Sequence, residues 1–177
     1  LYKDFIDLVG VNTNKHFNNI ICLQSQNECE ATADLVKCLA AKNQKVLVCT
    51  YSHTTQTSEV LDKQAPNWEI IVENGTDGKT VDTAHITIES QVIVRGLLDR
   101  LKKLSFEYDF IIVSLESEEI DKTHLGLINF ADWYFYVVDA CETKRTNLIQ
   151  KLKEMEFKGV CPEGFILDNV KEKLLQV

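Results

Sequence analysis

One stretch of sequence decides the fold of this chain, residues 18–42: NNIICLQSQNECEATADLVKCLAAK. Residues 18–24 are mostly apolar and predict a buried strand, whereas residues 33–42 place apolar side chains at the spacing of a helix with one buried face. The short polar segment 25–32 joins the two, and a second apolar run at 45–49 follows the helix. The sequence therefore predicts the order strand, tight loop, helix, strand.

The rest of the chain continues this alternation. Apolar runs typical of strands occur at 68–72, 110–113, 133–138 and 165–167, with a short extra strand predicted at 85–88. Helices are predicted at 1–10, 57–64, 91–104, 117–130 and 144–157, and residues 73–83 are predicted as the main loop.

Strands that alternate with helices predict an α/β fold, a doubly wound, mostly parallel sheet with helices on both faces. The uninterrupted run 110–113 is typical of a central parallel strand. Residues 1–177 are expected to form a single domain. Ligand sites in such folds lie at the carboxyl ends of the strands.

Composition argues against several classes of function. The chain carries 27 acidic against 19 basic residues, for a net charge of −8. Nucleic acid is not an expected partner, because its phosphates need clustered Lys and Arg. No apolar stretch approaches the ~18 to 20 residues that span a bilayer. Because the chain begins at Leu1 and its only methionine is Met155, we expect it to be cut from a longer protein.

The six cysteines form no CxxC pair, and Cys22, Cys38 and Cys49 lie within apolar patterns, which suits buried reduced thiols. Cys29, at a helix N-terminus, could be an activated thiol, but the neighbouring carboxylates favour a structural role. The four histidines are scattered and none has a ligand-like partner at helical spacing, so no metal site is expected.

Five segments carry a resemblance to a known family: 20–32, 46–52, 108–114, 131–143 and 164–168. In order, they match a strand with a Walker A loop, a strand ending in Asp-x-Asp, the YDxxIID Walker B strand, an AD…VV…T strand and a terminal GxVLN strand. The chain thus resembles the deviant-Walker P-loop family of MinD/ParA-type ATPases. It resembles more closely the cytoplasmic domain of the bacterial tyrosine kinases attached to polysaccharide chain-length (co-polymerase) proteins.

The groups that bind nucleotide in that family are replaced here. Glu30 stands where the family has its phosphate-binding Lys, Ala31 where it has the magnesium-binding Ser/Thr, and Ser114 where it has the Walker B Asp. The degenerate loop consists of Ser25, Gln26, Asn27, Glu28, Cys29, Glu30, Ala31 and Thr32, and its degenerate partner positions are Thr50, Ser52, Ser114 and Asp168. Glu28 and Glu30 are also expected to satisfy the helix N-terminus themselves. The resemblance therefore implies a pseudoenzyme, with no catalytic residue and no bound cofactor.

Other acidic and aromatic residues admit a structural or a functional interpretation. Asp109 and Asp132 precede strands, where turn or cap roles are expected. Residues 133–136 are expected to be strand core rather than a base-stacking platform. Asp139 follows a strand end and is the best remaining acidic candidate at the ligand edge.

Three function classes remain. The first is a non-catalytic cytoplasmic domain of a protein that regulates chain length in capsular or exo-polysaccharide biosynthesis, at the cytoplasmic face of the bacterial inner membrane. Its partners would be the membrane-embedded portion of its own chain or the export machinery. The second is an unconventional nucleotide-binding tyrosine kinase or ATPase domain, and the third is a stand-alone α/β adaptor. The family's ring-forming Glu-x-x-Arg-x-x-Arg motif is replaced by Asp4, Asp7 and Gly10, so the isolated domain is expected to be a monomer or weak dimer.

Overall fold

The computed structural model describes residues 19–25, 30–52, 68–73, 81–88, 94–117 and 120–170. The strands are β1 (Ile20–Ser25), β2 (Val46–Ser52), β3 (Trp68–Glu73), β4 (Val81–Ile88), β5 (Phe110–Glu116), β6 (Trp133–Asp139) and β7 (Gly164–Asp168). The helices are α2 (Glu30–Ala41), α3 (Val94–Leu104), α4 (Lys122–Phe130) and α5 (Arg145–Phe157). None of the helices in these ranges is long and apolar enough to cross a membrane.

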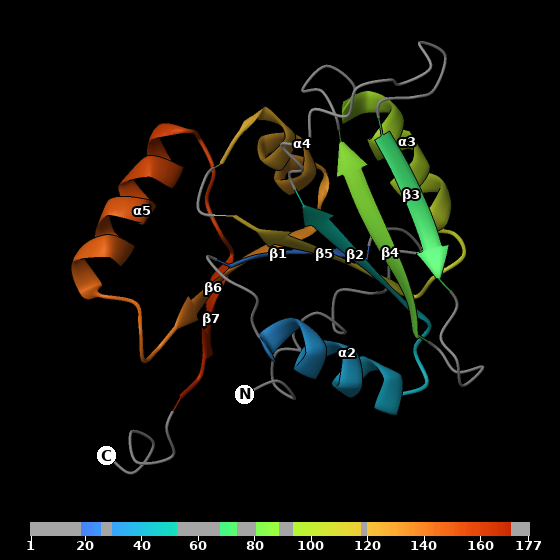
Figure 1. Ribbon diagram of the computed structural model, residues 1–177, viewed down its shortest axis with the longest axis horizontal. Helices are drawn as coiled ribbons and strands as arrows, with labels where there is room; N and C mark the ends of the chain where they lie inside the picture. Colours follow the sequence, from blue (N-terminus) through green and yellow to red (C-terminus); the bar gives the residue numbers. More distant parts are fainter. Residues whose placement is uncertain are drawn as a thin grey trace, which may run out of the picture.

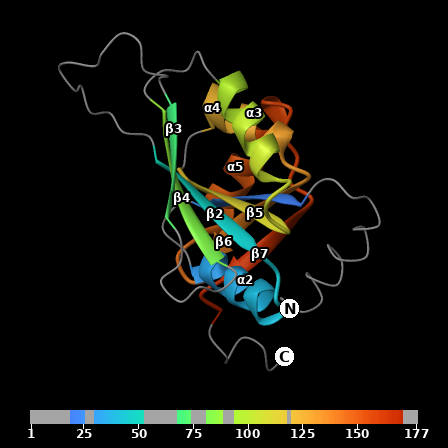
Figure 2. The same cartoon turned by 90° about the vertical axis from the view of Figure 1, so that its right-hand side faces the viewer.

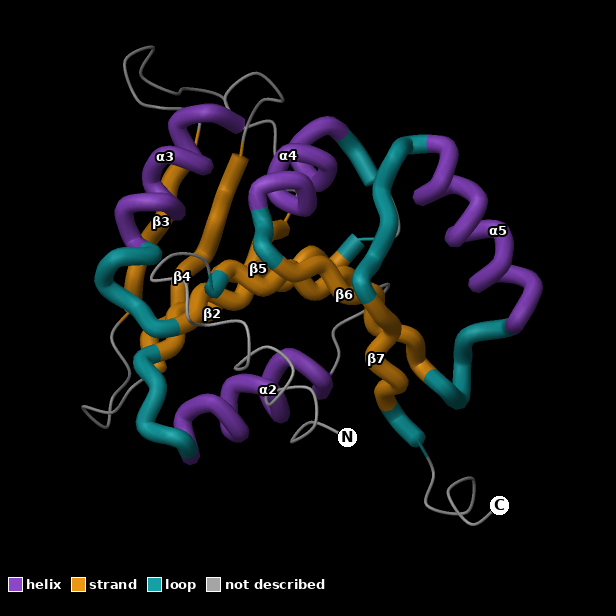
Figure 3. The backbone as a smooth tube through the Cα atoms, turned by 180° about the vertical axis from the view of Figure 1, so that it is seen from behind, coloured by secondary structure: helices purple, strands orange, loops and turns teal. Residues whose placement is uncertain are grey.

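The described strands form one seven-stranded sheet in the order β3-β4-β2-β5-β1-β6-β7 (Figure 1). Only β3 runs antiparallel to its neighbour, β4, and the other strand pairs are parallel. Helix α2 covers one face, and α3, α4 and α5 cover the other, as Figures 2 and 3 show. The predicted doubly wound, mostly parallel α/β fold is confirmed.

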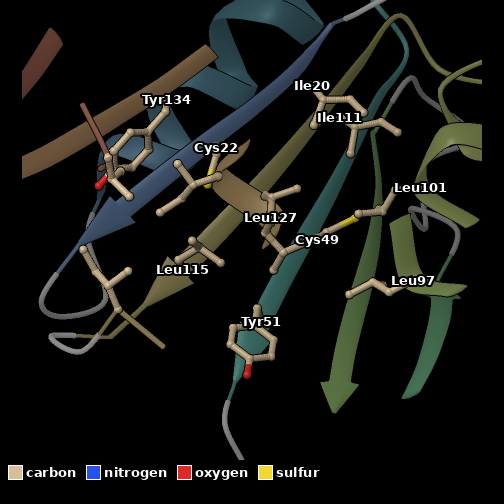
Figure 4. Packing of buried hydrophobic residues seen from close by; sticks show 14 of the residues in the cluster. Ile20, Cys22, Cys49, Tyr51, Leu97, Leu101, Ile111, Leu115, Leu127 and Tyr134 are labelled. Atoms are coloured by element: carbon tan, nitrogen blue, oxygen red, sulfur yellow. The ribbon is translucent and has the colours of Figure 1, made fainter. Parts of the chain in front are cut away.

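Strand β5 lies at the middle of this sheet and is buried on both faces. Ile111 and Val113 belong to the larger core cluster, which includes side chains of α3 and α4; Figure 4 shows Ile111 with Leu101 and Leu127 of this cluster. Phe110 and Ile112 pack against α2. On one side β5 pairs with β1, and on the other with β2. Its alternating side chains therefore join the two layers of core, as expected for an uninterrupted apolar run in a parallel sheet.

Two aspartates fix the strand starts at the opposite edge from the ligand edge. The Asp109 carboxylate accepts the backbone N–H of Lys45 at 2.7 Å, and that of Asp132 accepts the N–H of Ile20 at 3.0 Å. The predicted turn or cap roles of Asp109 and Asp132 are confirmed. Residues 133–136 are likewise strand core, with Tyr134, Phe135 and Tyr136 buried.

Most element boundaries differ from the sequence expectation by up to three residues, and the starts of β4 and α4 differ by more. The sequence predicts residues 81–83 as loop, but they begin β4, in which residues Val81 to Thr87 pair in parallel with β2. The sequence pattern does not indicate this start, because Asp82 and Thr83 are polar and interrupt the apolar run. Helix α4 begins at Lys122 rather than near Ser117, because Asp121 is its N-cap and accepts the N–H groups of Thr123 and His124.

Some expectations concern residues outside the described ranges. These are the helices at 1–10 and 57–64, and residues 91–93 of the helix expected at 91–104. The described part of that last helix, α3, buries Leu97, Leu101 and Leu104, which are on the predicted inner side.

Replacing Ile112 by Ala should lower the free energy of unfolding by about 2–5 kcal/mol, because a fully buried side chain beneath α2 is truncated and leaves a cavity in the core. Urea denaturation monitored by circular dichroism measures the change. The matched control is Phe106→Ala, at a side chain that is 66% exposed, with an expected change within about 0.5 kcal/mol. Equal costs for the two variants would contradict the central position of β5.

Candidate functional site

The parallel strands bring the predicted site positions to one edge of the sheet. Strands β1, β2, β5, β6 and β7 end there at Ser25, Ser52, Glu116, Asp139 and Asp168. In the sheet register Ser114 lies beside Thr50 on one side and beside Leu23 on the other. The register thus places Thr50 beside Ser114, and Ser52 follows two residues later at the end of β2. Gln26, Asn27, Glu28 and Cys29 of the loop lie outside the described residues.

The start of α2 contacts a carboxylate of the chain itself. The backbone N–H of Glu30, the first residue of the helix, donates a hydrogen bond of 3.1 Å to Oδ2 of Asp168, at the end of β7. Free N–H groups and the helix dipole make such a terminus the position where P-loop folds bind phosphate. At the Glu30 N–H itself the carboxylate comes from Asp168, 138 residues further along the chain. The expectation that Glu28 and Glu30 satisfy this terminus stays a prediction, because Glu28 lies outside the described residues.

The two magnesium positions hold no carboxylate. Ala31 is fully buried and packs with Leu35 in the core beneath α2, so its methyl group belongs to the core of the protein. Ser114 is buried within β5 and offers only a hydroxyl. Among the described residues, no group of three or more His, Cys, Asp or Glu side chains is placed to hold a metal ion. Hard cations such as Mg²⁺ are bound through carboxylates, and these positions supply none.

A buried glutamine, which the sequence analysis counted only as a strand residue, ties three elements together at this edge. Gln24 is fully buried; its Nε2 donates to the Ser117 carbonyl at 3.1 Å, and its Oε1 accepts from the Tyr134 hydroxyl at 2.6 Å. The Ser117 N–H in turn donates to the Ser25 carbonyl at 3.1 Å. Burial raises the pKa of Tyr134, which keeps its hydroxyl a donor. The signal available in the sequence was an amide at the end of an apolar strand.

A second polar cluster lies at the ends of β6 and β7. Oδ1 of Asp139 accepts the backbone N–H groups of Cys141 at 2.7 Å and Glu142 at 2.8 Å, and Oδ2 accepts from the Asn169 amide at 3.3 Å. Burial opposes ionisation of Asp139, but these hydrogen bonds outweigh it and hold its pKa below the usual value. Asp139, the acidic candidate at this edge, therefore organises the turn after β6.

A third cluster surrounds the start of α4. His124 is buried, with Nδ1 2.8 Å from Oδ1 of Asp121 and its ring edge-on to Tyr51 at 5.1 Å between centroids. No described group hydrogen-bonds the buried Nε2 of His124. Burial raises the pKa of Asp121, but the hydrogen bonds from His124 and Thr123 and the charge of His124 prevail, so the net shift is downward. Asp121 thus acts as an ionised helix cap.

The described cysteines differ in burial, and none of them is paired in a disulfide. Cys22 and Cys49 are buried, and burial raises the pKa of Cys49 to about 12, which leaves its thiol protonated. Cys38 is half-buried on α2, whereas Cys141 and Cys161 are exposed. The expectation of buried thiols holds fully for Cys22 and Cys49 and in part for Cys38.

Comparison with known proteins supports the fold assignment. No family model matches the chain, and no curated protein matches it in sequence. The kinase domain of Escherichia coli tyrosine kinase ETK has a TM-score of 0.68 at 15% identity, over 96% of this chain and 74% of that one. The BceF tyrosine kinase domain gives 0.65 at 15% identity, over 96% and 76% of the two chains. The Aquifex aeolicus MinC:MinD cell division complex gives 0.63 at 15% identity, over 89% and 72%.

These similarities, all at low identity, concern the fold. The chain has the fold shared by bacterial tyrosine kinase domains and MinD-type P-loop proteins, as its strand order and motif positions predicted. Within that fold, the first residue of α2, Glu30, hydrogen-bonds through its backbone N–H to the Asp168 carboxylate.

Replacing Tyr134 by Phe should cost about 1–3 kcal/mol of unfolding free energy, because Oε1 of the buried Gln24 loses its donor. A double-mutant cycle with Gln24→Leu measures the coupling by urea denaturation. We expect the double variant to cost clearly less than the sum of the single changes. Strict additivity would show that the hydrogen bond does not link β1 to β6.

The lowered pKa of Asp121 predicts an acid-sensitive helix cap. A carboxylate whose pKa is lower in the folded state stabilises at pH above its ordinary value of 3.8, and this contribution is lost as the pH falls through the lowered pKa. Asp121→Ala should therefore cost about 1 kcal/mol at neutral pH and less in strong acid. Urea titrations at the two pH values test this, with Asp34→Ala, in an exposed pair with Lys37, as control. A cost for Asp121→Ala that does not change with pH would contradict the prediction.

Proposed function

We propose that this chain is a non-catalytic cytoplasmic domain, a pseudo-kinase or pseudo-ATPase, of a bacterial protein that regulates chain length in polysaccharide biosynthesis. One observation carries the non-catalytic part. The Asp168 carboxylate accepts the Glu30 N–H at the start of α2, where a nucleotide phosphate would bind in this fold.

Electrostatics favours this intramolecular anion over a nucleotide. A phosphate at the same N–H would have to displace Asp168 and would then lie beside the carboxylates of both Asp168 and Glu30. Two like unit charges about 4 Å apart near a protein surface repel by roughly 4 kcal/mol. The positions that relieve such repulsion in the family, by a Lys and a bound magnesium ion, hold Glu30, Ala31 and Ser114. Phosphoryl transfer depends on these positioning charges.

The retained core supports a role for the folded domain itself. Strand β5 is buried between two core clusters. At the carboxyl edge, hydrogen bonds from Gln24 connect β1 to Ser117 and to Tyr134 of β6. A folded domain without nucleotide chemistry is suited to contact a partner through its surface. We infer that the partner is the membrane-embedded portion of its own chain or the polysaccharide export and polymerisation machinery.

The biological setting rests on analogy. The resemblance of the five motif segments to the tyrosine kinases of polysaccharide export is accompanied by similarity in fold to the ETK and BceF kinase domains. Fold alone does not determine function. We place the domain at the cytoplasmic face of the bacterial inner membrane, as a monomer or weak dimer when isolated, because Asp4, Asp7 and Gly10 replace the ring-forming motif.

We expect no binding of ATP with magnesium at micromolar concentration, because the anion position carries a carboxylate and no described group is placed to hold the metal. Isothermal titration calorimetry of the 177-residue chain measures this. Asp168→Asn, which removes the charge but keeps the size, is the matched variant, and we expect it too to bind no ATP at micromolar concentration, because Glu30, Ala31 and Ser114 are unchanged in it. A micromolar dissociation constant for the unmodified chain would favour the alternative, an unconventional nucleotide-binding kinase or ATPase.

The polysaccharide role needs a separate measurement. Deletion of the domain from the full-length protein in its source bacterium should change the length distribution or the export of the polymer. Unchanged polymer length and export would contradict that role and favour a stand-alone adaptor.

A further inference from the structure

Exposed apolar side chains gather at one end of the molecule. Among the described residues, five large apolar side chains are strongly exposed, and four of them belong to α5 and β7. These four are Ile149 (44% exposed), Phe157 (91%), Phe165 (47%) and Leu167 (51%). Helix α5 and strand β7 lie at the same end of the molecule, far from α3 (Figures 1 and 3). The fifth exposed side chain, Phe106, follows α3 at the other end.

The outer side of α5 combines exposed apolar groups with cations. Arg145, Ile149, Lys153 and Phe157 are spaced four residues apart, which places them along one side of the helix, and all four are exposed. We call these four residues the α5 stripe. The inner side carries Lys151 and Met155, which are buried.

The charge of α5 is opposite to that of the chain. Residues 144–158 hold five Lys or Arg against two Glu, in a protein whose net charge is −8. Glu154 is engaged by Lys158 at 2.7 Å and by Lys151 at 3.1 Å, and the hydrogen bond from Lys158 helps to lower its pKa. Arg145 and Lys153 make no ion pair with a described residue. The cations of the stripe are therefore available to an external anion.

We propose that the α5 stripe binds an anionic phospholipid surface. Phe157 would enter the headgroup layer while Arg145 and Lys153 contact lipid phosphates. The proposal rests on the proposed function in that a membrane-anchored domain is held within reach of the bilayer.

The spacing of the apolar groups favours lipid over a protein partner. Ile149 and Phe157 are separated by eight residues, about 12 Å along the helix, with Lys153 between them. Protein interfaces concentrate their binding energy in a contiguous desolvated centre, which the stripe does not offer. A headgroup layer accepts separate aromatic and aliphatic groups between cations.

Co-sedimentation of the 177-residue chain with vesicles tests the proposal. Binding is expected to phosphatidylcholine vesicles that contain phosphatidylglycerol, to be weak with phosphatidylcholine alone, and to fall as salt is added. Lys153→Glu should weaken binding at least fivefold, since each cation near such a surface contributes about 1 kcal/mol. Phe157→Ser should weaken it roughly tenfold through loss of apolar burial.

Matched controls come from the other end of the molecule. Phe106→Ser and Lys103→Glu make the same changes at exposed positions in or after α3 and should leave vesicle binding within about twofold of the unmodified chain. All these positions are exposed, so thermal melting followed by circular dichroism should be the same for every variant.

The contradicting results are distinct. Absence of binding, equal binding to the two kinds of vesicle, or equal loss in the control variants would overturn the proposal. So would a concentration-dependent dimer in sedimentation equilibrium that Phe157→Ser abolishes, which would assign the stripe to a second copy of the chain. A chain that binds both vesicles and ATP with magnesium would contradict the proposed function while leaving the stripe intact.

Discussion

The structure depends on the burial of β5 between β1 and β2. A strand covered on both faces can bury side chains at every position, and residues Phe110 to Leu115 are all buried, with Ser114 as the one polar side chain among them. Its parallel pairing with both neighbours aligns their carboxyl ends, so the register sets Thr50, Ser114 and Leu23 side by side. The location of the candidate site is therefore a consequence of core packing. Any chemistry at this edge is determined by which polar groups the packed strands bring there.

Those polar groups are used to close the edge. Gln24 pairs with Ser117 and Tyr134, Asp139 pairs with the turn that follows it, and Asp168 contacts the start of α2. A buried amide costs free energy unless both of its ends are paired, and Gln24 has both paired. A catalytic P-loop leaves its helix N-terminus open to phosphate. Here one N–H of that terminus already has an anionic partner, the Asp168 carboxylate, and the proposed non-catalytic role is argued from this contact.

Much of the fold could be predicted from local pattern, because strands such as β5 and β6 are apolar runs and α3 has a periodic inner side. The start of β4 could not, since Asp82 and Thr83 are polar and owe their strand conformation to pairing with β2. The predicted start of α4 was wrong because several polar residues between Ser117 and Asp121 could cap a helix. The hydrogen bonds that Asp121 accepts from Thr123 and His124 are visible only in the structure. The replaced loop positions were visible in the sequence. The contact between Asp168 and Glu30 could not be predicted from the sequence, because the two residues are 138 positions apart and the position of β7 in the sheet brings them together.

Stability and nucleotide chemistry make different demands on the same positions of this fold. At position 31 a magnesium-binding hydroxyl would have to face the ligand, whereas the methyl group of Ala31 is packed with Leu35 in the core. At Ser114 a carboxylate would be charged among the buried apolar side chains of β5, at a cost that a bound cation could offset. Replacement by small, neutral side chains removes that cost. The packing of the described core therefore requires neither an ion nor a phosphate at these positions, which is compatible with the proposed role of the surface, including the α5 stripe.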